Sequence, residues 1–235
     1  MAPPEPPPLV VEGPTFSFTA YLWAAGLTGR SSTLPPLPTT DIDISFVDAL
    51  PDFDGGIMGA GEISWGRWHF LTDIMLSQVS PEGSLLGADV ELRTRSITLQ
   101  QDVLYRVYSD ATVDLDLGAG LRYWHLDNRL KIGPTALVPG GVDYDVNEDW
   151  VDPVLAARAI VRVSGPWSLT LAGDIGGFDV GSKLTYEVVG LVNYRWSDSW
   201  TFHTGYRLLS VDYENGDFLY DVRQHGPMLA ATYKF

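Results

Sequence analysis

The sequence contains no cysteine, which excludes disulfide bonds and thiolate chemistry. Basic residues are scarce, because 15 Lys and Arg stand against 30 Asp and Glu, for a net charge of −15. Nucleic-acid binding needs a basic surface, so we expect no nucleic-acid partner. No stretch approaches the roughly 18 uninterrupted apolar residues of a membrane-spanning helix. These absences exclude a disulfide-stapled domain, a nucleic-acid-binding protein and a helical membrane protein.

Aromatic residues and glycine are abundant, with 8 Trp, 11 Tyr, 9 Phe and 24 Gly. After residue 15 the chain forms long segments in which apolar and polar residues alternate, as in β-strands with two different faces. In the segment 112–126, Leu115 and Leu117 fall on one face, and Asp114 and Asp116 fall on the other. The segments exceed the ~9–11 residues with which a tilted strand crosses a bilayer. A soluble sandwich also alternates, but its strands average about 5–6 residues.

The connections between these segments differ in length at their two ends. Short turns lie at Gly66 and at 109–111, 164–166 and 197–199, whereas 29–54 and 128–149 are long and polar. Outer-membrane barrels have this asymmetry, with tight periplasmic turns and long external loops. Aromatic residues cluster beside the short turns and predict a girdle at one membrane interface. They are Trp65, Trp68, Tyr105, Tyr108, Trp167, Tyr194, Trp196 and Trp200.

The sequence therefore predicts an all-β fold, a closed antiparallel transmembrane β-barrel of about ten strands, within a range of eight to twelve. We assign residues 15–235 to the barrel and the Pro-rich residues 1–14 to a periplasmic tether. We place the segment 41–47 in the external loop 29–54, because a spanning strand there would reverse the side of the Gly66 turn. The leader 1–14 has neither a basic region nor an apolar core, so we expect a mature chain without its signal peptide.

The last residues alternate, with Leu229, Ala231, Tyr233 and Phe235 on one face. A terminal aromatic residue after such alternation resembles the C-terminal signal of bacterial outer-membrane barrels. The resemblance implies that Tyr233 and Phe235 are read by the barrel-assembly machinery. It also implies a location in the outer membrane of a Gram-negative bacterium, with Phe235 beside the first strand. We expect the barrel to be a monomer.

Five stretches are similar to a family of small proteobacterial outer-membrane barrels that is largely uncharacterised. They are 21–29 (YLWAAGLTG), 149–158 (DWVDPVLAAR), 173–182 (GDIGGFDVGS), 205–213 (GYRLLSVDY) and 224–235 (QHGPMLAATYKF). The resemblance implies a fold and a location. It implies no catalytic residue and no cofactor.

The inward face of the predicted strands carries many charges of both signs. A barrel of this size is narrow enough for side chains to fill it, so buried charges must pair. We expect an integral barrel of structural or narrow-pore type, and the alternatives are a binding barrel with acidic external loops or a lipid-modifying enzyme. The predicted charge network consists of Glu62, Asp73, Asp102, Arg106, Asp114, Asp116, Arg122, Asp152, Arg158, Arg162, Asp174, Glu187, Arg195 and Arg207.

Catalytic and metal sites are not expected. His69 and His203 lie near periplasmic turns, His125 has lipid-facing parity and His225 leans inward, without a nucleophile–base pattern. The stretch 143–149 (DYDVNED) alternates oxygen ligands but lacks the glycine and the distal glutamate of a calcium loop. We expect outer-membrane lipids and lipopolysaccharide as partners, with divalent cations bridging the acidic loops to lipopolysaccharide as a further hypothesis.

Overall fold

The computed structural model describes residues 13–35, 38–80, 82–85, 88–134 and 139–235, so most of the predicted tether lies outside the described residues. The described chain is almost entirely β-structure, with a short helix α1 (Phe46–Ala49) and a 3₁₀ turn η1 (Leu50–Asp52). No helix in this part of the chain is long or apolar enough to cross a membrane. The strands are β1 (Thr15–Trp23), β2 (Gly26–Ser32), β3 (Thr40–Ile44), β4 (Phe53–Trp65), β5 (Trp68–Val79), β6 (Glu82–Leu85), β7 (Ala88–Ser109), β8 (Val113–Ile132), β9 (Val142–Ser164), β10 (Trp167–Gly177), β11 (Leu184–Arg195), β12 (Trp200–Asn215) and β13 (Phe218–Lys234).

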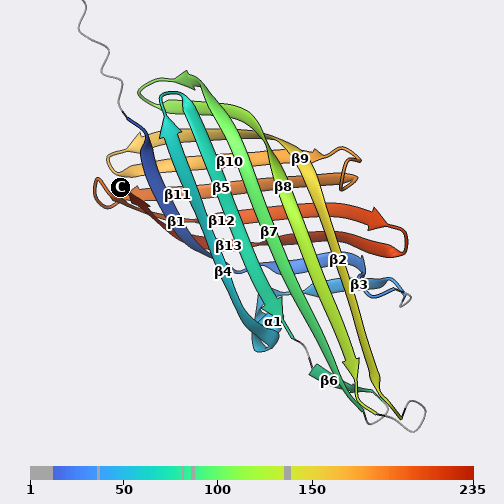
Figure 1. The fold of residues 1–235 in the computed structure, drawn as a ribbon. Helices are drawn as coiled ribbons and strands as arrows, with labels where there is room; N and C mark the ends of the chain where they lie inside the picture. The colour runs from blue at the N-terminus through green and yellow to red at the C-terminus, as the bar shows by residue number, and fades with distance from the viewer. Residues whose placement is uncertain (1–12, 36–37, 81, 86–87, 135–138) are drawn as a thin grey trace, which may run out of the picture.

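Ten of the described strands form a closed antiparallel barrel, in the order β1, β4, β5, β7 and then β8 to β13 (Figure 1). The first and last strands close it, with a ladder from Ser17 opposite Lys234 to Trp23 opposite Met228. The amide of Phe235 donates to the carbonyl oxygen of Phe16 at 2.9 Å. The predicted barrel is confirmed, and the terminal residues are held by backbone pairing.

The two ends of the barrel differ as the turn lengths indicate. The tight turns between β4 and β5, β7 and β8, β9 and β10, and β11 and β12 lie at one end, together with the C-terminus (Figure 1). We call this the periplasmic end, because outer-membrane barrels place their short turns there. Toward the opposite, external end, the long strands β7, β8 and β9 extend beyond their neighbours (Figure 1).

Much of what the sequence predicted as external loop is paired strand. β8 continues to Ile132 and β9 begins at Val142, and their ladder joins Asn128 to Val146 across the segment 128–149. In 29–54, β3 pairs with β2, and Arg30 lies opposite Asp41. The segment 41–47 is thus external, as expected, but it is largely strand and helix rather than loop. Because both strands of this solvent-exposed ladder carry charged residues, their composition resembles that of a loop.

The barrel wall divides at its external end. β10 pairs with β9 only from Val154 to Ser164 of β9. The ladder ends at Pro153, because proline has no N–H to donate to a further backbone hydrogen bond. β13 passes from β1 to β2 beside Gly226, where a Cβ atom would lie 1.9 Å from the carbonyl oxygen of Ala24. The outer parts of β7, β8 and β9 therefore diverge from β10 to β13 (Figure 1).

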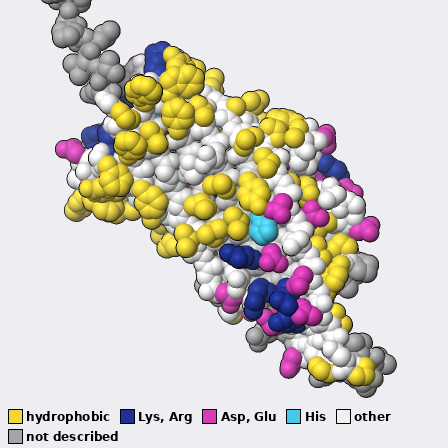
Figure 2. Space-filling model, in the orientation of Figure 1, with side chains coloured by type: hydrophobic (Ala, Val, Ile, Leu, Met, Phe, Trp, Pro, Cys, Tyr) yellow, Lys and Arg dark blue, Asp and Glu magenta, His cyan; other side chains and the backbone are white. Residues whose placement is uncertain are grey.

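The outward face of the barrel is apolar near the periplasmic end. On β8, Leu115, Leu117 and Leu121 are exposed, whereas Asp114, Asp116 and Arg122 at the alternate positions are buried, which matches the predicted alternation. Hydrophobic side chains cover this end of the molecule, and charged side chains gather over the outer part of the long strands (Figure 2). The polar residue Gln101, which the alternation places on the lipid-facing side of its strand, donates to Thr72 Oγ1 at 3.0 Å.

The predicted aromatic girdle surrounds the periplasmic end. Ring centroids lie 4.9 Å apart for Trp68 and Tyr105 and 4.7 Å apart for Trp167 and Tyr194. Tyr233 lies between Trp200 and Phe235, at 5.0 Å from each. Aromatic rings of this kind sit at a membrane–water interface.

Candidate functional site

The inward positions of the strands bring most of the predicted charge network together inside the barrel, in two layers. The layer near the periplasmic end is centred on Asp116, whose side chain is fully buried. Arg106 Nε lies 2.8 Å from Asp116 Oδ1, and Arg158 lies 2.9 Å from Asp116 Oδ2 and 2.8 Å from Glu62. Arg162 pairs with Asp114. The layer joins β4, β7, β8 and β9, because each carboxylate faces an arginine on another strand.

His69 belongs to this layer and has a serine partner that the sequence analysis missed. Its Nδ1 lies 2.8 Å from Glu62 Oε1 and 3.0 Å from Ser64 Oγ. A hydrolytic triad needs the serine on one ring nitrogen and the acid on the other. Here both partners share Nδ1, and Nε2 is buried with no hydrogen-bond partner among the described residues. The sequence signal that could have identified this serine is the close spacing of Glu62, Ser64 and His69 on a tight hairpin.

The central layer is organised around Arg122, which has no exposed surface. Its guanidinium donates to Gln100 Oε1 at 2.5 and 2.9 Å, to Asp174 Oδ2 at 2.7 Å and to Thr185 Oγ1 at 2.9 Å. Gln100 in turn donates to Asp102 at 2.8 Å. These contacts span the barrel from β7 and β8 to β10 and β11.

Arg207 extends the central layer toward β1 and β5. It lies 2.8 Å from Glu187 and 3.3 Å from Asp73, and it donates to the hydroxyl of Tyr21 at 2.9 Å. Glu187 also lies 3.4 Å from Arg122, so one carboxylate joins the two arginines. A lattice of charge-assisted hydrogen bonds therefore crosses the whole lumen.

Asp152 differs from the prediction, because its partners in the described structure are neutral. Its Oδ2 accepts hydrogen bonds from the indole N–H of Trp124 at 3.1 Å and of Trp150 at 3.2 Å. It also accepts from the hydroxyl of Ser182 at 2.7 Å, and Oδ1 accepts from the Ser182 amide at 2.6 Å. The carboxylate thus holds the β10–β11 turn against β8 and β9, where the ladder between β9 and β10 has ended.

Arg195 also differs from the prediction. It is the last residue of β11, is exposed, and forms none of the ion pairs found in the described part of the chain. The alternation that buries a side chain in the middle of a strand no longer does so at the rim. Arg195 is therefore outside the charge network.

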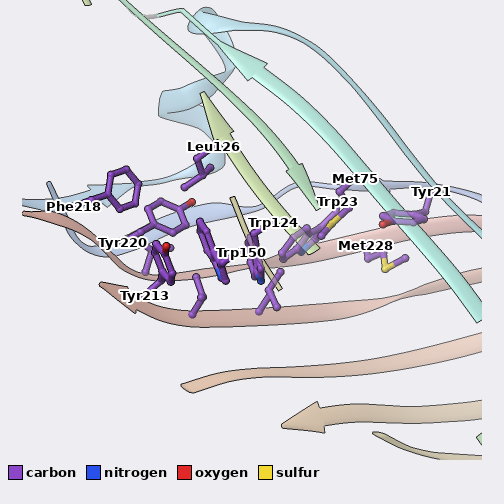
Figure 3. Packing of buried hydrophobic residues seen from close by; sticks show 13 residues of the cluster. Tyr21, Trp23, Met75, Trp124, Leu126, Trp150, Tyr213, Phe218, Tyr220 and Met228 are labelled. Atoms are coloured by element: carbon purple, nitrogen blue, oxygen red, sulfur yellow. The ribbon is translucent and has the colours of Figure 1, made fainter. Parts of the chain in front are cut away.

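An aromatic core fills the external end of the lumen, which the sequence analysis did not predict (Figure 3). The rings of Trp124 and Trp150 stack at 5.6 Å, and those of Trp150 and Tyr213 stack at 3.9 Å. Leu126 and Leu209 beside them are 1% exposed. We call this set the outer aromatic core. Its buried members are Tyr21, Trp23, Met75, Trp124, Leu126, Trp150, Leu209, Val211, Tyr213, Phe218, Tyr220, Val222 and Met228.

The sequence signal for this core is a change along a single strand, where the inward-facing side chains turn from polar to apolar. On β12, Arg207 points inward and Tyr206 outward, but two and four residues beyond Arg207 the inward, buried residues are the apolar Leu209 and Val211. Inside the bilayer the apolar side chains face lipid, whereas beyond it water surrounds the strand and the apolar side chains face inward. The reversal marks the external edge of the membrane.

The external part of β8 and β9 carries paired charges. Arg129 lies 2.7 Å from Asp143 and 3.2 Å from Asp145. The hydrogen bond from Arg129 holds the pKa of Asp143 below its usual value. In the described part of the chain, no group of three or more His, Asp or Glu is arranged to hold a metal ion.

The other histidines lie in two kinds of surroundings. His203 is inside the barrel, 2.8 Å from Asn193 and from Thr232. His125, on the outer surface, lies 2.8 Å from Asp149. His225 was expected to lean inward, but it shares the outward face of Leu229 and lies 2.7 Å from the hydroxyl of Tyr206, also outward-facing. The even spacing along β13 explains the difference.

Comparisons with known proteins support the fold. No protein-family model matches the chain, and no curated protein matches its sequence. The outer membrane protease OmpT from Escherichia coli is similar in structure, with a TM-score of 0.57 and 8% identity over 94% of this chain and 97% of that chain. The translocator domain of the autotransporter NalP from Neisseria meningitidis has a TM-score of 0.45 and 11% identity, over 94% of this chain and 87% of that one. Neisserial surface protein A has a TM-score of 0.36 and 15% identity, over 95% and 100%.

The likeness to OmpT concerns the fold alone, since the identity is low. Together with the closed barrel and its apolar outer band, it supports one coarse conclusion. The protein has the fold of a bacterial outer-membrane β-barrel.

Proposed function

We propose that the protein is a structural barrel with a closed, side-chain-filled lumen that does not conduct ions. The observation that carries the proposal is that two different layers block the same passage. The central layer crosses the lumen through Arg122 and Arg207, which are 0% and 3% exposed. The outer aromatic core fills the lumen beyond it, with Trp124 only 2% exposed. This supports the structural alternative over the narrow pore.

An external binding role is the second candidate. The β8–β9 hairpin extends past the apolar band to Ile132 and Val142, and its surface carries ordered charge pairs such as Arg129 with Asp143. An ordered surface of this kind is suited to recognising a partner outside the cell or lipopolysaccharide.

We do not propose an enzyme, because the arrangement of Ser64 and His69 lacks the base–nucleophile geometry of a hydrolase. The barrel-assembly machinery would read Tyr233 and Phe235, as in the bacterial outer-membrane barrels whose C-terminal signal the sequence resembles.

Planar-bilayer recording tests the closed lumen. The purified protein, inserted into a bilayer at high salt, is expected to give no discrete current steps. A porin added to the same membrane afterwards provides the control that small openings are detected. Reproducible steps from the unaltered protein would contradict the proposal and favour the narrow pore.

A further inference from the structure

One polar side chain interrupts the apolar outer wall within the membrane-crossing band. Gln101 on β7 is exposed and has the outward parity of its neighbours along the strand, Leu99 and Val103. Val103 is 42% exposed, and Tyr105 of the aromatic girdle follows it toward the periplasmic end. Gln101 therefore faces the hydrocarbon of the bilayer and not its headgroups.

The amide of Gln101 keeps hydrogen-bonding groups that its own chain does not use. One amide N–H donates to Thr72 Oγ1 at 3.0 Å. Among the described residues, the amide oxygen, the second N–H and the hydroxyl proton of Thr72 have no further hydrogen-bond partner. Lipid chains offer no partner either, and an unpaired polar group in hydrocarbon is costly. The groups are satisfied by a neighbour that supplies both a donor and an acceptor.

The wall beside Gln101 is low enough for another protein to approach closely. Thr72 on β5 lies opposite Gln101 on one side and opposite Gly61 of β4 on the other, so the three residues form a row across three strands. A Cβ atom added to Gly61 would meet no atom of the chain within 4 Å. Ile63 and Phe70, both 42% exposed, stand on the periplasmic side of this row. The row is therefore a small, polar strip beside larger apolar side chains.

We propose that the outer face of β4, β5 and β7 is the interface of a homodimer in the membrane, with Gln101 close to the two-fold axis. In a two-fold dimer the same surface meets itself, so a residue near the axis meets its own copy. Two glutamine amides can exchange a pair of N–H···O=C hydrogen bonds, because each has both a donor and an acceptor.

A second copy of the chain is the occupant that the chemistry favours. An acyl chain can cover Gly61 and Thr72, but it leaves the amide of Gln101 unpaired. A second copy covers the same strip and also pairs the amide. A dimer departs from the monomer expected from the sequence, and it does not depend on the closed lumen.

Analytical ultracentrifugation in density-matched detergent micelles tests the interface, because it gives the mass of the protein alone. The unaltered protein is expected to have the mass of two chains. Gly61→Leu raises the strip and is expected to give the mass of one chain. The matched control is Gly190→Leu, an outward position on β11 across the barrel, where an added Cβ also meets nothing within 4 Å. The control is expected to remain a dimer, and the shift in gel mobility on heating reports that both variants are folded.

Gln101→Leu separates the hydrogen bonds from the shape of the surface. It removes two bonds across the axis and is expected to raise the dissociation constant of the dimer roughly tenfold or more. Thr204→Leu replaces a polar outward residue on β12, away from the strip, and is expected to leave that constant unchanged.

Crosslinking tests the contact in native membranes, because the chain has no cysteine and a single introduced thiol reports its own surroundings. With a short thiol-specific crosslinker, Val103→Cys is expected to give a product of two chains. Leu229→Cys, at an outward position that is 60% exposed on β13, is expected to give none.

Three results would overturn the dimer. Val103→Cys could give no product of two chains, or it could crosslink to a different protein, which would assign the face to that partner. Alternatively, Gly61→Leu and Gly190→Leu could have the same mass in micelles. None of these results bears on the closed lumen, because conductance is measured independently.

Discussion

Replacing Arg122 with alanine is expected to lower the free energy of unfolding by about 3–5 kcal/mol, the range for removing one partner of a buried ion pair. Arg122 is fully buried and neutralises Asp174 and Glu187 while donating to Gln100 and Thr185. Without it, two carboxylates stay in the lumen with fewer partners. Denaturant unfolding of the protein in detergent micelles, followed by circular dichroism, measures the loss.

Two further variants test whether the loss of stability arises from the buried ion pairs of Arg122. Arg129→Ala removes an arginine whose ion pairs with Asp143 and Asp145 are exposed, and it is expected to leave stability unchanged within error. Adding Asp174→Asn to Arg122→Ala is expected to restore part of the loss, because the unpaired charge is then removed as well. A loss for Arg122→Ala no greater than that for Arg129→Ala would show that the central layer does not stabilise the barrel.

Replacing Trp150 with alanine is expected to cost about 3–5 kcal/mol, as for large aromatic residues removed from a packed core. Its ring stacks between Trp124 and Tyr213, and its N–H donates to Asp152 and Ser182. The variant therefore leaves both a cavity and a buried carboxylate with one donor fewer. The gel mobility of the protein, measured after incubation at a series of temperatures and without boiling, reports the loss of stability. This assay does not rely on tryptophan fluorescence.

Trp150→Phe is the matched control for this experiment. It keeps an aromatic ring in the stack but removes the N–H donor and part of the indole, so it is expected to lose about 1–3 kcal/mol. Equal losses for the two variants would show that the hydrogen bond to Asp152, and not the stack, holds the β10–β11 turn against β8 and β9. No loss for either would contradict the outer aromatic core as a stabilising element.

The membrane-embedded part of the fold could be predicted from sequence because two solvents divide each strand. Leu117 meets lipid and Asp116 meets the lumen, so a period of two in the sequence reports both faces. The closing strand was predictable because the last residues alternate and end on Phe235, which resembles the C-terminal signal of outer-membrane barrels. In the same way, the alternation placed Arg122 and Arg158 in the lumen, although it could not say which carboxylates they would meet.

The external part was harder to predict because the rule changes there. Asp143 and Asp145 look like loop residues by composition, yet they lie on a strand that is paired on one side and wet on the other. Tyr213 has the parity of the lumen but the environment of a soluble core. Rim positions such as Arg195 escape the alternation altogether. Pairing partners across a lumen depend on strand tilt and register, which short-range patterns do not contain.

The outer aromatic core draws Tyr21 and Trp23 from the first strand and Phe218, Tyr220 and Val222 from the last. The residues from the first strand and those from the last can pack together only when β1 has paired with β13. We therefore expect the outer aromatic core to be completed in the step that closes the barrel wall.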